Sequence, residues 1–512
     1  MSTSYRIVKN TSYLYAKMLI SIFVSLLTTR IVLDSLGASD MGIFGVLGSA
    51  IAMLGFINTS MAFATQRFMN YQEGKGDLLV KKRIYNASVV IHFFISVFIV
   101  VVFLLIEPVV FDYLVKIDTN RLFAARWVYR FSIFSTFFTI ITVPYDAVIN
   151  SHENMFFYSL VGVIDVFLKL FVAFFISITV YDKLIMYGLL MTIVSVATFL
   201  MMYCYCVKKY EECIFAPKKY FDYKLLKQVM SFGGWNLVGT SSTMLSNYGV
   251  NIVVNNFFGT VLNATLSICT QLTSQLLALS TNLMKAANPV IVKKEGAGQR
   301  LKMYEITFTA CKLSYITYVV IAVPFLLECE FILRFWLKEV PPYCLQFCQL
   351  TFFLKLIEQI TTPLNTTISA VGKIKQYNIV ISIFQFFQVA LLVLFFMYGL
   401  APYYCVVAMI VSAFMCSVYK ILYCKKYMSM DYLFFIHSIV IRCLLHSFIS
   451  ICVGFLILCL MQEGLIRLLV VGFVTLFFNV FLFYAYLLQS NEREITNSVL
   501  INILGKLKPI IG

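Results

Sequence analysis

Residues 18–37, "MLISIFVSLLTTRIVLDSLG", have the composition of a membrane-spanning helix and its exit turn. The stretch is mostly aliphatic and is long enough to cross a hydrocarbon core about 30 Å thick as a helix. Gly37 ends it, and Arg30 lies inside it. Apolar stretches of similar length recur to the end of the chain, so the sequence predicts an all-α polytopic membrane protein.

The composition supports this fold class. Of 512 residues, 61% are hydrophobic and 12% charged, whereas soluble domains average about 25% charged residues. The 14 cysteines are scattered without zinc-like spacing, so we expect no metal or cofactor. Cys329 and Cys344 flank one outer loop, where two buried thiols are the preferred interpretation over a bridge. No cleavage pattern follows the first apolar stretch, which favours an uncleaved first span.

Fourteen membrane spans are expected. They cover residues 12–34, 41–64, 84–106, 122–143, 156–178, 184–206, 231–255, 263–285, 304–327, 344–370, 379–398, 402–423, 437–460 and 466–488.

The distribution of cations orients these spans. With both termini in the cytoplasm, inner segments carry twenty-six lysines and arginines and outer loops carry six. Cations concentrate on the cytoplasmic side of membrane proteins, so this orientation is predicted. Most of the net charge of +16 therefore reflects topology and attraction to membrane lipids, and no nucleic-acid partner is expected.

An internal repeat divides the chain into two halves. "EGKGD" at 73–77 matches "EGAGQ" at 295–299, and Gly37 matches Gly259 at the same offset. Six spans in each repeat give both halves the same orientation, which predicts two facing six-helix bundles. The expected domains are an N-terminal bundle, a basic cytoplasmic linker, a C-terminal bundle, and two additional helices with a tail, at residues 1–206, 207–230, 231–424 and 425–512.

Such an architecture is typical of transporters, in which a substrate site between the halves opens alternately to each side. The chain has no nucleotide-hydrolysis motif. Energy would then come from an ion gradient, the membrane potential or the substrate gradient.

Charged side chains inside spans are costly, so they face a cavity, find a partner or reach the headgroups. Arg126 and Arg130 repel each other one turn apart, which favours an external anion, with headgroup contact as the alternative. Arg30 either pairs with Asp34 or joins Arg126 and Arg130 in an electropositive cavity suited to phosphate. The candidate substrate-binding cations are Arg30, Arg126, Arg130, Lys169, Lys312 and Lys355.

Neutral polar residues dominate two spans of the second half. Amides suit sugars, although membrane helices also use them to bond to one another. The candidate substrate-binding amides are Asn247, Asn251, Asn255, Gln271 and Gln275. Asp165 and Glu358 are candidates for ion coupling, although Lys169 and Lys355 lie one turn away and favour local ion pairs.

Three motifs carry a resemblance: "TTRIVLDSLGASDMGIFGVLG" at 28–48, "ATQRFMNYQEGKGD" at 64–77 and "PYDAVINSHENMFFY" at 144–158. Together they resemble bacterial polysaccharide, or O-antigen, flippases of the MATE-like multidrug/oligosaccharidyl-lipid/polysaccharide exporter superfamily. The resemblance implies two six-helix bundles with two extra C-terminal helices in the bacterial inner membrane. It also implies export of an undecaprenyl-pyrophosphate-linked oligosaccharide to the periplasmic leaflet for lipopolysaccharide or other surface polysaccharide assembly. A polysaccharide polymerase and glycosyltransferases would be its partners.

Two other functions compete with this one. A MATE-like exporter of drugs or small solutes shares the fold, but a cavity for cationic drugs should be acidic. A membrane-embedded glycan polymerase or ligase would need a sizeable outer domain, and the longest outer loops have about 15 residues. The four histidines form no recognisable catalytic set, so no catalytic residue and no enzymatic activity are expected.

Overall fold

The computed structural model describes residues 3–52, 55–114, 117–337, 340–489, 492–494 and 497. Every regular element in these residues is a helix. The chain forms two compact units, a first unit of Asn10–Leu237 and a second unit of Val238–Gly512 with Met1–Lys9. Each unit is described by itself.

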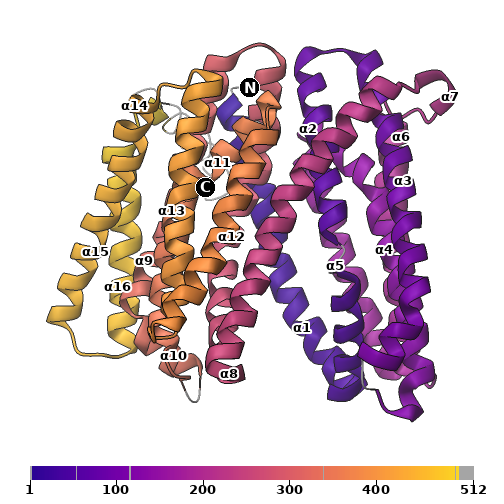
Figure 1. The fold of residues 1–512 in the computed structure, drawn as a ribbon, viewed down its shortest axis with the longest axis horizontal. Helices are drawn as coiled ribbons and strands as arrows, with labels where there is room; N and C mark the ends of the chain where they lie inside the picture. The colour runs from indigo at the N-terminus through magenta and orange to yellow at the C-terminus, as the bar shows by residue number, and fades with distance from the viewer. Residues whose placement is uncertain are drawn as a thin grey trace, which may run out of the picture. The chain divides into compact units, whose positions relative to one another are not determined.

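The first unit is arranged around α4, which packs against α2, α3 and α6 (Figure 1). Its core includes Tyr129, whose hydroxyl donates to the Phe103 carbonyl on α3 at 2.9 Å. Short π-helical and 3-10 turns at Val110–Leu114 and Thr119–Arg121 join α3 to α4. The helices are α1 (Thr3–Ala52), α2 (Gly55–Lys75), α3 (Leu78–Val109), α4 (Leu122–Ser151), α5 (Met155–Ile178), α6 (Lys183–Lys209) and α7 (Pro217–Tyr220).

In the second unit α11 packs between α9 and α13, and the two C-terminal helices α15 and α16 pack against α9 (Figure 1). Two π-helical segments, Ile436–Ile441 and Phe483–Leu487, precede α15 and follow α16. The helices are α8 (Tyr223–Gly296, of which the residues up to Leu237 belong to the first unit), α9 (Arg300–Leu327), α10 (Cys329–Trp336), α11 (Cys344–Val371), α12 (Lys375–Met397), α13 (Tyr404–Met428), α14 (Tyr432–Phe435), α15 (Arg442–Leu460) and α16 (Leu465–Leu482).

Among the described residues, 11 helices are long and apolar enough to cross a membrane. One of them, α8, has 74 residues and includes two of the expected spans. The described residues of the expected span at 41–64 lie in the second part of α1 and in α2, and the expected span at 344–370 lies in α11. Neither α2 nor α11 is among the 11.

Two glycines divide the longest helices at equivalent places of the repeat. Gly37 interrupts α1 with a φ of 78°, and Gly259 interrupts α8 with a φ of 81°. Residues with a side chain rarely adopt this left-handed backbone, whereas glycine adopts it readily. The matching glycines of the sequence repeat therefore form matching sharp bends between consecutive spans.

The basic segment expected to be a linker is packed on the first unit. Asn86 of α3 donates to the Ile214 carbonyl at 2.9 Å and accepts from the Ala216 amide at 2.8 Å. Asp222 forms an ion pair with Arg83 at 3.1 Å. These contacts hold the chain against α3 before α8 begins.

Candidate functional site

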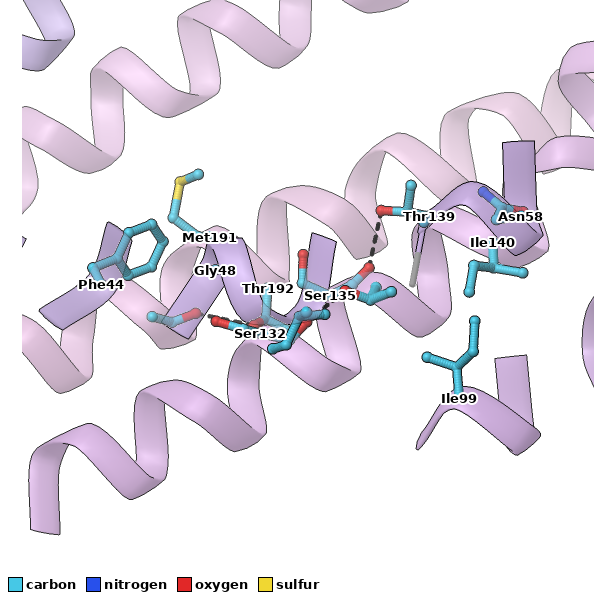
Figure 2. Close-up of a pocket in the computed structure, with 14 residues that line it drawn as sticks. Phe44, Gly48, Asn58, Ile99, Ser132, Ser135, Thr139, Ile140, Met191 and Thr192 are labelled. Carbon is cyan, nitrogen blue, oxygen red and sulfur yellow. Dashed lines mark hydrogen bonds between the residues drawn. The ribbon is translucent and has the colours of Figure 1, made fainter. Parts of the chain in front are cut away.

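The first unit contains a pocket of about 270 Å³ (Figure 2). Residues from five helices line it, and the α4 contribution is a row of hydroxyls. The lining residues used below are Asn58 of α2, Ser132, Ser135, Thr136 and Thr139 of α4, and Thr192 of α6.

Several polar atoms of this pocket are available as hydrogen-bond acceptors. Thr136 and Thr139 donate to the carbonyls of Ser132 and Ser135 at 2.9 and 3.0 Å, and Thr192 donates to backbone carbonyls at 2.9 Å. The Asn58 side-chain oxygen is buried and has no hydrogen-bond partner. Because the threonine hydrogens are already used, the free lone pairs suit a ligand that donates hydrogen bonds, such as a hydroxyl group or water.

This pocket was not predicted from the sequence, although a signal for it exists. Ser132, Ser135, Thr136 and Thr139 follow the spacing i, i+3, i+4, i+7, which places all four on one face of a helix. A search for polar stripes, in addition to charges, would have found them.

Arg30 and Arg126 are both exposed on the first unit. Neither has a carboxylate within ion-pair distance among the described residues, so the expected alternative of an Arg30–Asp34 pair is not formed there. The Arg126 guanidinium instead lies 5.6 Å from the centre of the Phe111 ring. These two arginines therefore have their hydrogen-bonding capacity available.

Arg130, in contrast, is bound to Glu107. Its guanidinium donates two hydrogen bonds to the carboxylate, at 3.0 and 3.2 Å. The sequence prediction placed Glu107 in an outer loop, but α3 continues to Val109 and brings the carboxylate beside α4. Tertiary pairing thus separates two arginines that the sequence treated alike.

The three candidate lysines are also paired with carboxylates. Lys169 lies 2.7 Å from Asp165, and Lys355 lies 2.7 Å from Glu358. Lys312 is 2% exposed and lies 2.7 Å from Glu492, which the C-terminal segment supplies. Both ion-coupling candidates therefore have a lysine beside them. Of the six candidate substrate-binding cations, Arg30 and Arg126 have no carboxylate partner among the described residues.

The five candidate amides lie along α8 on both sides of Gly259. Asn247, Gln271 and Gln275 are exposed, while Asn251 and Asn255 are half-buried. Within the described part of the chain their side chains make no hydrogen bond. They are therefore free to bind water or a ligand.

A charged cluster that the sequence did not predict joins the ends of α2, α3 and α4. Glu212, 2% exposed, accepts a hydrogen bond from His152 at 2.6 Å, while Lys81 lies 2.8 Å from Glu73. Burial by itself would raise the pKa of Glu212, but the hydrogen bond from His152 and the charges of His152 and Lys81 outweigh it. The pKa of Glu212 is consequently lowered from its ordinary value.

Glu212→Gln is expected to lower the free energy of unfolding by about 1–3 kcal/mol at neutral pH, because a buried hydrogen bond to a charged group is lost. The lowered pKa means that the Glu212 contribution is complete above pH 4.5 and disappears as the pH falls below that value. Thermal unfolding of detergent-solubilised protein across this range measures the effect. The exposed neighbour Glu211 is the control, and an equal loss in Glu211→Gln would contradict the assignment.

Comparison with known proteins agrees with this architecture. Residues 237–395 match the MatE family model, and no curated protein matches the chain significantly. A crystal structure of MATE in the bent conformation has a TM-score of 0.72 at 12% identity, covering 84% of this chain and 98% of that one. An outward-facing multidrug resistance MATE family transporter of the MOP superfamily has a TM-score of 0.71 at 13% identity, with coverage of 84% and 98%.

A third structure is a MOP superfamily transporter from Pyrococcus furiosus, with a TM-score of 0.70 at 12% identity and coverage of 84% and 98%. Its description gives a reverse polarity of the binding pocket, which suggests a different function for that protein. At these identities the likeness shows the fold alone. The chain is thus a multi-pass membrane protein with the MATE-like fold, which confirms the predicted fold class. The region that matches the MatE family model, residues 237–395, begins at the last residue of the first unit and otherwise lies in the second unit.

Proposed function

We propose that this protein is a flippase that moves an undecaprenyl-pyrophosphate-linked oligosaccharide from the cytoplasmic to the periplasmic leaflet by alternating access. The observation that carries the proposal is the pair Arg30 and Arg126, exposed and without carboxylate partners in a MATE-like fold. A guanidinium group binds phosphate oxygens through two parallel hydrogen bonds. The motifs shared with polysaccharide flippases favour the same substrate.

The physical need for these cations follows from the charge of the substrate. A bare pyrophosphate carries roughly two negative charges, and moving it through hydrocarbon would be prohibitive. Fixed cations along a hydrated path replace the water that the headgroup loses. Outward movement is also favoured by about 2.3 kcal/mol per charge for each 100 mV of interior-negative potential.

The neutral polar residues support the sugar part of the proposal. Exposed amides in hydrocarbon would have unsatisfied hydrogen bonds, so we infer that Asn247, Gln271 and Gln275 face a hydrated surface. There they would bind sugar hydroxyls, together with Asn251 and Asn255. The acceptors of the pocket on α4 are suited to the same donors.

Ion coupling is a further part of the proposal. Asp165 and Glu358 are proposed to bind the coupled ion, a proton or sodium, which would release Lys169 and Lys355 from their ion pairs. Those lysines would then be available to the anionic headgroup. Lys312 and Arg130 would need a comparable release from Glu492 and Glu107.

An exporter of drugs or small solutes is the second candidate function, since a multidrug MATE transporter has the same fold. A cationic drug requires a carboxylate, and the two ion-coupling candidates, Asp165 and Glu358, are each paired with a lysine. An enzyme is less favoured, because His92 and His446 are fully buried and hydrogen-bonded to backbone carbonyls. We therefore propose transport without covalent chemistry.

Deleting the gene is expected to make the lipid-linked oligosaccharide accumulate on the inner leaflet, because the barrier to its headgroup is restored. The measurement compares labelling of the oligosaccharide by a membrane-impermeant reagent in spheroplasts and in inverted vesicles. Re-expression of the wild-type gene should return the label to the outer leaflet. A deletion strain with normal surface glycan and altered drug sensitivity would favour the small-solute exporter instead.

A further inference from the structure

Three cysteine thiols meet in the core of the second unit. Cys269 lies on the part of α8 that follows Gly259, while Cys344 and Cys348 lie on the first turns of α11. The Sγ atom of Cys269 is 3.1 Å from that of Cys348 and 3.8 Å from that of Cys344. All three residues are 1% exposed or less. The sequence interpretation considered Cys344 with Cys329, but the fold places it beside Cys269.

Local helix geometry explains why the three sulfurs converge. Cys344 and Cys348 are four residues apart, so their side chains lie on one face of α11, one turn above the other. Cys269 faces both of them from α8. Cys269 therefore has two neighbouring thiols, Cys348 and Cys344, as possible partners.

The compartment in which the thiols lie decides their chemistry. Cys344 directly follows the segment 329–343, which the distribution of lysines and arginines assigns to the outer face. On this orientation, which the proposed function shares, the cluster is at the periplasmic end of α11. Disulfides form and persist in the bacterial periplasm, whereas cytoplasmic thiols are kept reduced.

Charge favours a disulfide over a bound metal ion. Two thiolates on a tetrahedral zinc, each about 2.3 Å from the ion, would be about 3.8 Å apart. Cys269 and Cys344 have this separation, but Cys269 and Cys348 are closer together, at 3.1 Å. Three thiolates around a divalent ion would also leave one negative charge at a site that is almost fully buried. A disulfide is neutral and apolar.

We propose that Cys269 and Cys348 form a disulfide that ties α8 to α11, with Cys344 as the alternative partner of Cys269. The oxidant is the disulfide of an oxidised dithiol carrier in the periplasm. The Cys348 thiolate, having released its proton to water, attacks one carrier sulfur and forms a mixed disulfide while one carrier thiolate leaves. The Cys269 thiolate then attacks the Cys348 sulfur, and the second carrier thiolate leaves.

The overall exchange converts two thiols and the carrier disulfide into one protein disulfide and a carrier dithiol. Because the cysteines are buried in the folded chain, the exchange takes place before α8 and α11 pack together. The bond would then fix the segment of α8 after Gly259 on α11. These two helices would move as one body in any conformational change.

The test counts free thiols in the full-length protein. Cells are lysed directly into denaturant with N-ethylmaleimide and no reductant, and the purified chain is weighed by mass spectrometry. We expect two fewer adducts than the 14 cysteines, and 14 after reduction. Peptide mapping without reduction should recover the Cys269–Cys348 link. Fourteen adducts without reduction would overturn the proposal.

Three variants make the assignment specific. Cys269→Ser should have every remaining cysteine alkylated, whereas the control Cys311→Ser, buried on α9, should still lack two adducts. Cys348→Ser should form the alternative Cys269–Cys344 link. Finding one zinc ion per wild-type chain that is lost in Cys269→Ser, with all thiols free, would establish a metal site instead. None of these readouts depends on transport, so they separate this inference from the proposed substrate.

Discussion

Arg467→Met is expected to lower the free energy of unfolding by about 3–5 kcal/mol, the effect typical of removing one partner of a buried ion pair. Arg467 of α16 donates two hydrogen bonds to the Glu328 carboxylate, at 2.8 and 2.9 Å. The Glu328 side chain is 0% exposed. Without the guanidinium, a buried negative charge would remain where α9 meets α10. Thermal unfolding in detergent micelles measures the loss.

A second ion pair of the same unit provides the control. Arg334 pairs with Glu330 one turn away, but both side chains are more than half exposed, so Arg334→Met should cost only about 0.3–0.5 kcal/mol. Adding Glu328→Gln to Arg467→Met should recover much of the stability, because the stranded charge is removed. Equal losses in the Arg467 and Arg334 variants would show that burial of Glu328 does not determine the effect.

Arg126→Ala and Arg30→Ala are each expected to reduce export of surface glycan about tenfold or more, because a hydrogen bond to a charged group contributes about 1.5–3 kcal/mol. Both arginines are exposed and without carboxylate partners among the described residues. Arg126→Lys and Arg30→Lys should retain more export, since lysine keeps the charge but loses the two-pronged contact. Surface glycan per amount of protein in the membrane measures the effect.

Arg130 is the matched control for Arg126, one turn further along α4. Its guanidinium is bound to Glu107, so Arg130→Ala should reduce the amount of folded protein more than the export per molecule. If Arg126→Ala exports normally, the arginine contacts lipid headgroups and the proposed role is wrong. If alanine and lysine variants lose protein equally, Arg126 has a structural role.

Much of the fold could be predicted from the sequence because a membrane imposes simple rules. Backbone groups in hydrocarbon must bond within their own helix, so apolar length alone located the spans. Gly37 and Gly259 occupy equivalent places in the sequence repeat, and both have a positive φ angle in the structure. The predicted spans at 41–64 and 344–370 are the more polar cases, because α2 and α11 are not among the 11 helices that are long and apolar enough to cross a membrane.

The candidate site was harder to predict, because the state of a charged residue depends on neighbours distant in the sequence. Local spacing was sufficient to predict the ion pairs of Asp165 with Lys169 and of Lys355 with Glu358, because the partners of each pair are one helical turn apart. It could not find the partner of Lys312, since Glu492 is 180 residues further along the chain. The hydroxyl stripe on α4 was present in the sequence, but no pattern shows that α6 and α2 close it into a pocket.

The sequence by itself determined that this chain is an all-helical membrane protein with a repeat, because apolar length and glycine placement act locally along the chain. Only the tertiary structure decided which cations are neutralised and which thiols meet. Those outcomes depend on side chains that approach within about 4 Å, the range in which ion pairs form. Arg130 differs from Arg30 and Arg126 because Glu107, on the neighbouring helix α3, lies within this distance of it.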